Sequence, residues 1–127
     1  MLPMKNQNLI RYALITGASS GIGAACARLF AREGANVVIG ARRETRLRDI
    51  AAEIAASGGN VAHLAGDVRD EAFAHALVDL STDRFGALHG ALNNAGITGP
   101  ALPIPKLSVE DWNAVMETNL TSAFYGA

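Results

Sequence analysis

Three glycines, Gly17, Gly21 and Gly23, stand between an apolar run (12–15) and an alanine-rich segment with helical spacing (24–33). This order predicts a strand, a glycine turn and a helix. Gly17 lets the chain leave the strand with a positive φ, Gly21 keeps side-chain bulk away from an approaching ligand, and Gly23 lets the helix pack closely on the strand. The unpaired N–H groups and the positive dipole end of the helix then favour an anion such as a diphosphate.

Ser19 and Ser20 lie inside the same turn, before Ile22, and their hydroxyls can add donors to the anion site. An alternative for one of the two serines is that it only caps the helix. Glycine turns by themselves are weak evidence of a ligand, because many strand-to-helix connections contain glycine. The surrounding elements therefore decide whether a ligand is expected.

Composition predicts one globular domain over residues 1–127, because 50% of the residues are hydrophobic and 18% are charged. The formal net charge of −1 gives no general attraction to nucleic acid or to an anionic membrane, so neither is an expected partner. No apolar run approaches the roughly 20 residues that cross a bilayer, and residues 1–8 form an irregular polar lead-in without the apolar centre of a signal peptide. We therefore expect a cytoplasmic protein.

The single cysteine, Cys26, has no partner for an internal disulfide. It falls on an apolar stripe of the first predicted helix, together with Ile22, Leu29 and Phe30. We expect this stripe to face the core and Cys26 to serve packing rather than chemistry.

Hydrophobic periodicity predicts strands that alternate with helices. The strands are expected at about 10–15, 36–40, 60–65 and 88–92, and the helices begin near 20, 45, 70 and 108. With right-handed crossovers, this alternation predicts an α/β fold with a doubly wound parallel sheet of strand order 3-2-1-4. A ligand then belongs at the carboxyl ends of strands one and four, where the winding reverses. The glycine turn and the segment 93–96 both lie there.

Four motifs in order resemble the short-chain dehydrogenase/reductase family: TGxxxGxG at 16–23, Asp67-Val68, NNAG at 93–96, and Asn119 within 117–120. The resemblance extends from about residue 9 to residue 127. It implies a Rossmann-type fold that binds a nicotinamide dinucleotide. It also implies an oxidoreductase that transfers hydride between that cofactor and an alcohol or carbonyl substrate.

The same resemblance implies a role for each motif. The glycine turn, with Gly17, Ser19, Ser20, Gly21, Ile22 and Gly23, holds the pyrophosphate. Asp67 hydrogen-bonds the adenine ring and Val68 packs beside it, while Asn94, Ala95 and Gly96 line the nicotinamide ribose. Asn119 lies at a helix irregularity and helps to hold a water of a proton relay, which makes it the one catalytic residue expected here. From its residue type alone, Asn119 could equally be a solvent-facing or helix-bending asparagine.

The end of the second predicted strand bears on the choice of dinucleotide. Folds that select NAD place an acidic residue there to hold the ribose 2′-hydroxyl, and this chain has Ala41 instead. Arg42 and Arg43 follow, and a guanidinium fork pairs well with the 2′-phosphate of NADP. We therefore predict NADP over NAD. An alternative is a solvated basic face that also includes Arg46 and Arg48, and for those two residues it is the favoured interpretation.

The family's catalytic tyrosine and lysine, in a YxxxK motif, have no match. Tyr125 has no lysine four residues later, and Lys5 and Lys106 are the only lysines. His63, His75 and His89 share no metal-ligand spacing, so no metal site is expected. We therefore expect a Rossmann domain that is truncated before the later strands, is inactive alone, and acts on a small alcohol or carbonyl only if a C-terminal half is supplied.

Two other hypotheses remain open. The chain could be a non-catalytic dinucleotide-binding or interaction module, or an unrelated doubly wound domain of flavodoxin-like or phosphate-binding type. Truncation before the later strands would leave the fourth strand as a sheet edge with unpaired backbone groups, and the last helix would lack part of its packing. We therefore expect a homo-oligomer, or aggregation, through the exposed strand or helix.

Overall fold

The computed structural model describes residues 10–127, so the irregular lead-in predicted for residues 1–8 lies outside the described residues. The four strands are β1 (Tyr12–Thr16), β2 (Asn36–Ala41), β3 (Asn60–Ala65) and β4 (Gly90–Leu92). They form one sheet of order β3-β2-β1-β4 in which every pairing is parallel, which confirms the predicted doubly wound arrangement.

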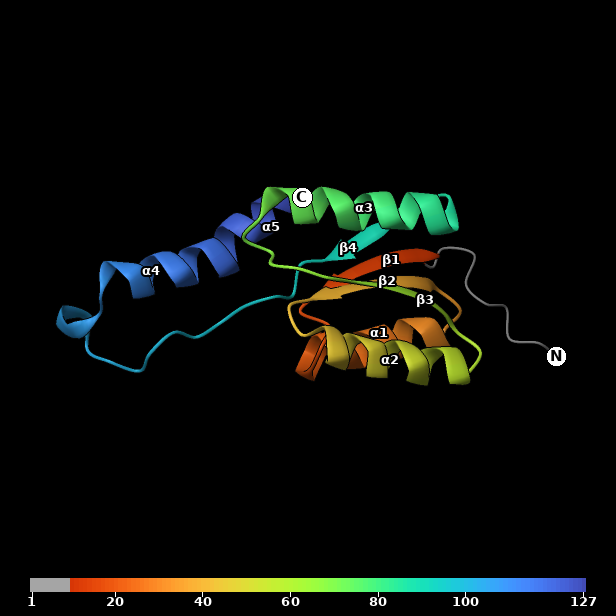
Figure 1. Ribbon diagram of the computed structural model, residues 1–127, viewed down its shortest axis with the longest axis horizontal. Helices are drawn as coiled ribbons and strands as arrows, with labels where there is room; N and C mark the ends of the chain where they lie inside the picture. The colour runs from red at the N-terminus through yellow and green to blue at the C-terminus, as the bar shows by residue number, and fades with distance from the viewer. Residues whose placement is uncertain (1–9) are drawn as a thin grey trace.

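Helices cover both faces of this sheet. The main helices are α1 (Gly21–Arg32), α2 (Glu44–Ala56) and α3 (Glu71–Phe85). Figure 1 shows α1 and α2 below the sheet and α3 above it, so the fold has three layers. The right-handed crossovers that join parallel strands produce this arrangement.

The register of the sheet assigns alternate residues to opposite cores. Ile15 pairs with Ile39, and both pack on the α1 and α2 side. Leu14 pairs with Val38, and both pack on the other side, where Leu77 of α3 covers them. Both faces of the strands are therefore apolar, as a buried parallel sheet requires.

The prediction that an apolar stripe of α1 faces the core is wrong in part. Its buried residues are Gly23, Ala24, Ala27 and Ala31, whereas Leu29 is exposed and Ile22 keeps 73% of its surface accessible. Cys26 and Phe30 are half-buried against the first core, which agrees with a packing role for the cysteine. The helix axis lies close to the sheet beside the glycine turn, and only small side chains fit between them.

The strand β4 is shorter than predicted, although backbone pairing with β1 extends one residue beyond its N-terminal end. The His89 N–H donates to the Tyr12 carbonyl over 2.9 Å, just before β4 begins. This short strand ends where the segment 93–96 begins, beside the carboxyl end of β1.

After β4 the chain leaves the sheet and returns along a helical arm. It passes through η1 (Ile104–Lys106), α4 (Val109–Met116), the π-helical turn η2 (Glu117–Thr121) and α5 (Ser122–Tyr125). Figure 1 shows α4 extending away from the layered body and α5 returning beside α3. Among residues 10–127, no helix has both the length and the apolar character needed to span a bilayer.

Candidate functional site

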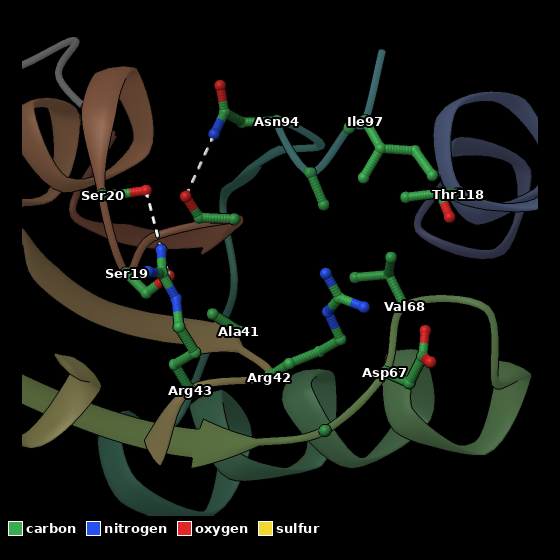
Figure 2. Close-up of a pocket in the computed structure, with 14 residues that line it drawn as sticks. Ser19, Ser20, Ala41, Arg42, Arg43, Asp67, Val68, Asn94, Ile97 and Thr118 are labelled. Carbon is green, nitrogen blue, oxygen red and sulfur yellow. Dashed lines mark hydrogen bonds between the residues drawn. The ribbon is translucent and has the colours of Figure 1, made fainter. Parts of the chain in front are cut away.

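A pocket of about 500 Å³ lies at the carboxyl ends of the strands. Its walls come from the turn after β1, the end of β2, the segment after β3, the segment after β4 and the turn η2 (Figure 2). The lining residues are Gly17, Ser19, Ser20, Ala41, Arg42, Arg43, Gly66, Asp67, Val68, Asn94, Ala95, Gly96, Ile97 and Thr118.

The glycine turn follows β1 directly, and glycine is required at each of its three positions for a different structural reason. Gly17 has a φ of 65°, and a Cβ there would lie 2.8 Å from the Ala95 Cα. A Cβ on Gly23 would lie 2.3 Å from the Gly17 carbonyl oxygen, so the helix can approach the turn only with glycine there. Gly21 has a φ of 55°, and a Cβ on it would meet no atom within 4 Å, which leaves open space before the helix N-terminus.

Asn94 joins the segment after β4 to the glycine turn. Its side-chain amide donates to the carbonyls of Thr16 at 3.2 Å and Gly17 at 3.3 Å. The Thr16 hydroxyl accepts hydrogen bonds from the backbone N–H groups of Asn94 and Ala95 at 3.1 and 3.3 Å. These bonds hold the carboxyl ends of β1 and β4 together and fix one wall of the pocket.

Arg43 lies across the glycine turn. One of its Nη atoms donates to the hydroxyls of Ser19 and Ser20, each at 3.1 Å (Figure 2). Ser20 occupies the N-cap position of α1, but its side chain makes no capping hydrogen bond. Both serine hydroxyls accept from the arginine, so their own hydrogens remain available to an anion in the turn.

Arg42 enters the pocket from the end of β2, directly after Ala41. Figure 2 shows its guanidinium inside the pocket, on the side of Val68. Within residues 10–127, its side chain makes no hydrogen bond or ion pair with another residue. Its donors therefore remain available to a ligand.

The Asp67 carboxylate is held by Arg69, two residues later. Oδ1 accepts from the Arg69 backbone N–H at 2.9 Å and from Nε at 3.2 Å, and Oδ2 accepts from Nε at 3.1 Å and from Nη2 at 2.7 Å. The Arg69 side chain, followed by its backbone N–H, lowers the pKa of Asp67 below its usual value, and the charge of Arg42 lowers that pKa further. Asp67 is therefore a fixed carboxylate at neutral pH.

Asn119 is held at the edge of the pocket by the backbone of Ile97. Its Oδ1 accepts from the Ile97 N–H, and its Nδ2 donates to the Ile97 carbonyl, both at 2.8 Å. The residue lies inside η2, where the α-helical pattern is interrupted by a π-helical turn. Asn119 is exposed to solvent although its amide bonds Ile97 at both ends, and it does not line the pocket itself.

All of the predicted cofactor-binding residues line this pocket except Gly21, Ile22 and Gly23. The sequence reasoning missed Gly66 and Thr118 as pocket residues, and it missed Arg69 as the partner of Asp67. Gly66 precedes Asp67 directly, so its position in the chain could have identified it. Thr118 comes from the distant turn η2, and its residue type carries no signal.

The histidines lie outside the pocket. His63 is in β3, while His75 in α3 lies 3.8 Å from Glu71. The His89 Nδ1 accepts from the Arg11 N–H at 3.3 Å, and its ring contacts Tyr12 edge-on. In the described part of the chain, no group of three or more His, Cys, Asp or Glu residues could hold a metal ion.

A family model described as short chain dehydrogenase matches residues 11–127. Cyclohexanol dehydrogenase of Acinetobacter sp. (strain SE19) is 38% identical over 96% of this chain and 49% of its own length. The A-factor type gamma-butyrolactone 1'-reductase (1S-forming) of Streptomyces virginiae is 42% identical over 90% of this chain and 44% of its own length. The chain thus spans about half the length of the curated relatives it matches.

A solved structure repeats the same architecture. L-sorbose reductase from Gluconobacter frateurii, complexed with NADPH and L-sorbose, superposes with a TM-score of 0.86 at 36% identity. The match covers 92% of this chain and 44% of the reductase. Sequence and structure therefore both place this chain beside the first half of larger proteins of one family.

Proposed function

The chain belongs to the short-chain dehydrogenase family, and from that premise we propose that it forms the NADP(H)-binding portion of an oxidoreductase. The family binds nicotinamide cofactors, and the relatives named above are dehydrogenases and reductases of alcohols and carbonyls. In the proposed reaction, hydride passes between the nicotinamide and an alcohol or carbonyl substrate.

The pocket fits a dinucleotide on grounds of shape and charge. The N-terminus of α1 opens onto free space at Gly21, so its unpaired N–H groups can meet a pyrophosphate. The hydroxyls of Ser19 and Ser20 lie in the same turn, and Asp67 lies across the pocket as an acceptor for an adenine amine. On this assignment Asn94, Ala95 and Gly96 meet the nicotinamide ribose.

The choice of NADP rests on the two residues at the end of β2, Ala41 and Arg42. Ala41 stands where an acidic residue would hold a ribose 2′-hydroxyl, and Arg42 follows with an uncommitted guanidinium in the pocket. A fork of N–H donors pairs with a phosphate, whereas an unmodified ribose offers it no charge. The NADPH in the L-sorbose reductase complex supports the same choice by similarity.

A bound nicotinamide supplies hydride chemistry, and this chain's residues bind and orient it. Asn119 would contribute through its place in η2, where it fixes Ile97 at the edge of the pocket. None of the 127 residues forms a tyrosine with a lysine four positions later. We therefore propose that residues outside these 127 complete the site and transfer the proton to or from the substrate.

Titration of the purified protein with NADPH and NADH, followed by the fluorescence of the reduced nicotinamide, tests this proposal. We expect both to bind and NADPH to bind more tightly. Equal dissociation constants would remove the NADP assignment and keep the dinucleotide site. Failure to bind either cofactor would favour an unrelated doubly wound domain. Cofactor binding without turnover, even when a C-terminal half is supplied, would favour a non-catalytic module.

We also propose that the protein associates with itself through the helical arm. Trp112, Leu120 and Phe124 expose 61%, 60% and 76% of their surfaces along α4, η2 and α5. Apolar side chains that gather on one exposed element favour a protein contact. The open side of β4 offers a second contact of the strand-pairing kind.

A further inference from the structure

Asp67 and Arg42 line the same pocket, and Arg69, which lies outside that lining, bonds the Asp67 carboxylate. Arg69 makes every hydrogen bond that the Asp67 carboxylate receives within residues 10–127, through Nε, Nη2 and its backbone N–H. Arg42 lies in the same pocket as Asp67 and has no such partner (Figure 2). The structure therefore pairs Asp67 with one arginine and leaves the other available.

Electrostatics would otherwise bring Arg42 and Asp67 together. They approach the pocket from the ends of neighbouring strands, β2 and β3. The positive charge of Arg42 already lowers the pKa of Asp67, so the two groups interact across the pocket. A carboxylate without another partner attracts the nearest guanidinium, and a bidentate pair would hold that guanidinium in place.

We propose that Arg69 is a positioning residue for cofactor selection: by occupying the Asp67 carboxylate, it keeps Arg42 free for the 2′-phosphate of NADP. This proposal rests on the proposed function, because it assumes that Arg42 meets a 2′-phosphate. It adds a residue outside the lining of the pocket that sets how strongly the pocket distinguishes NADPH from NADH.

The same contact has two further effects. The positive charge of Arg69 offsets the negative charge of Asp67, so the carboxylate repels the incoming phosphates of the cofactor less. It also fixes the orientation of the carboxylate, which faces the adenine on the proposed assignment, because Nε, Nη2 and the backbone N–H of Arg69 together make four hydrogen bonds to its two oxygens. Adenine is common to NADPH and NADH, so this second effect cancels when their affinities are compared.

The test measures, in three proteins, the dissociation constant of NADH divided by that of NADPH. A high ratio means a preference for NADPH. The wild type is expected to prefer NADPH. In Arg69→Gln, Asp67 is released and engages Arg42, and we expect the ratio to fall by about three- to tenfold. In the double variant Arg69→Gln with Asp67→Asn, the competing charge is gone, and the ratio is expected to return to within about twofold of the wild type.

Arg28→Gln is the matched control, because Arg28 also bonds a carboxylate through Nε, at 2.7 Å to Glu53, and lies outside the pocket. Its ratio should equal that of the wild type. A ratio in Arg69→Gln equal to the wild type, with the circular dichroism spectrum unchanged, would overturn the proposal, and so would a double variant that stays as low as the single one.

If Arg69→Gln does not fold, Asp67→Asn alone provides the decision. Removing the carboxylate leaves Arg42 as free as it is in the wild type, so the ratio should stay within about twofold of the wild-type ratio. A larger change in either direction would overturn the proposal, because Asp67 would then influence Arg42 even with Arg69 in place. A wild type without any preference for NADPH would instead refute the underlying NADP assignment, so the two failures are distinguishable.

Discussion

The side-chain amide of Asn119 pairs with the backbone of Ile97 in both directions, with two hydrogen bonds of 2.8 Å. Their positions are 22 residues apart in the chain, and the pair crosses from the π-helical turn η2 to the edge of the pocket. Gly96 permits the approach, because a Cβ there would lie 3.3 Å from the Asn119 Oδ1. The amide thus bonds both backbone polar groups of Ile97 and anchors the helical arm to the site.

Asn119→Asp tests this anchor. An aspartate keeps an acceptor for the Ile97 N–H but cannot donate to the Ile97 carbonyl, so we expect a loss of about 1–2 kcal/mol in the free energy of unfolding. Urea denaturation measures this loss, and hydrogen exchange should show faster exchange at Ile97. Asn113→Asp, at an exposed position of α4, is the matched control and should change neither quantity much.

Arg42→Asp tests the choice of cofactor. The substitution removes the fork and puts a negative charge beside the expected 2′-phosphate, so NADPH should bind about 5- to 100-fold more weakly, with a much smaller change for NADH. Fluorescence titration of both cofactors measures the difference. Arg48→Asp, on the surface of α2, is the control. Equal losses of NADPH and NADH affinity in Arg42→Asp would contradict the assignment.

Gly23→Ala tests the packing of α1 on the turn. The new Cβ would lie 2.3 Å from the Gly17 carbonyl oxygen and 2.6 Å from the Asn94 Nδ2, so either the turn or the helix must move. We expect a loss of about 1–3 kcal/mol in stability together with weaker binding of both dinucleotides. Gly58→Ala is the comparison, since its φ of 86° strains alanine but nothing lies within 4 Å. Stability should fall there without an effect on binding.

The ion pair of Asp67 and Arg69 predicts a dependence of stability on pH. Asp67 has a pKa lowered from 3.8 in the folded protein, so the unfolded chain binds more protons at acid pH. The contribution of the pair is present above pH 3.8 and disappears as the pH falls through the folded pKa. Urea denaturation of wild type and Arg69→Gln at several pH values should show a difference that shrinks on acidification.

Other carboxylates do not obscure that comparison. Hydrogen bonds from Arg28 and from Ser108 lower the pKa values of Glu53 and Asp111 as well, but both proteins keep these contacts. Their contributions therefore cancel in the difference between wild type and Arg69→Gln. A difference that grows as the pH falls would contradict the ion-pair explanation.

The fold could be predicted from the sequence because its determinants are local and periodic. Apolar runs such as Val37 to Ile39 mark buried strands, and the rule of right-handed crossovers converts their alternation with helices into the order 3-2-1-4. The outward direction of Ile22 could not be predicted in the same way. Helical spacing identifies an apolar stripe, whereas the distance between α1 and the sheet decides that alanines, not larger residues, fill the contact.

The site was predictable where its residues follow strand ends, as Asp67, Asn94 and the glycine turn do. What the sequence did not indicate is how its charges are paired. Arg42 and Arg43 are neighbours of the same type, yet Arg43 bonds Ser19 and Ser20 while Arg42 points into the pocket. Pairing of this kind depends on side-chain directions across different elements, and residue order alone does not contain them.

The exposed arm predicts self-association. Trp112 and Phe124 remain largely accessible on α4 and α5, and burying such aromatic side chains contributes much of the energy of a protein contact. Sedimentation velocity over a range of concentrations should show species heavier than a monomer. Replacing both aromatics by lysine should shift the distribution toward the monomer, whereas Leu29→Lys on α1 should not. A monodisperse monomer at every concentration would contradict the proposed contact, because the exposed aromatics would then have no partner in solution.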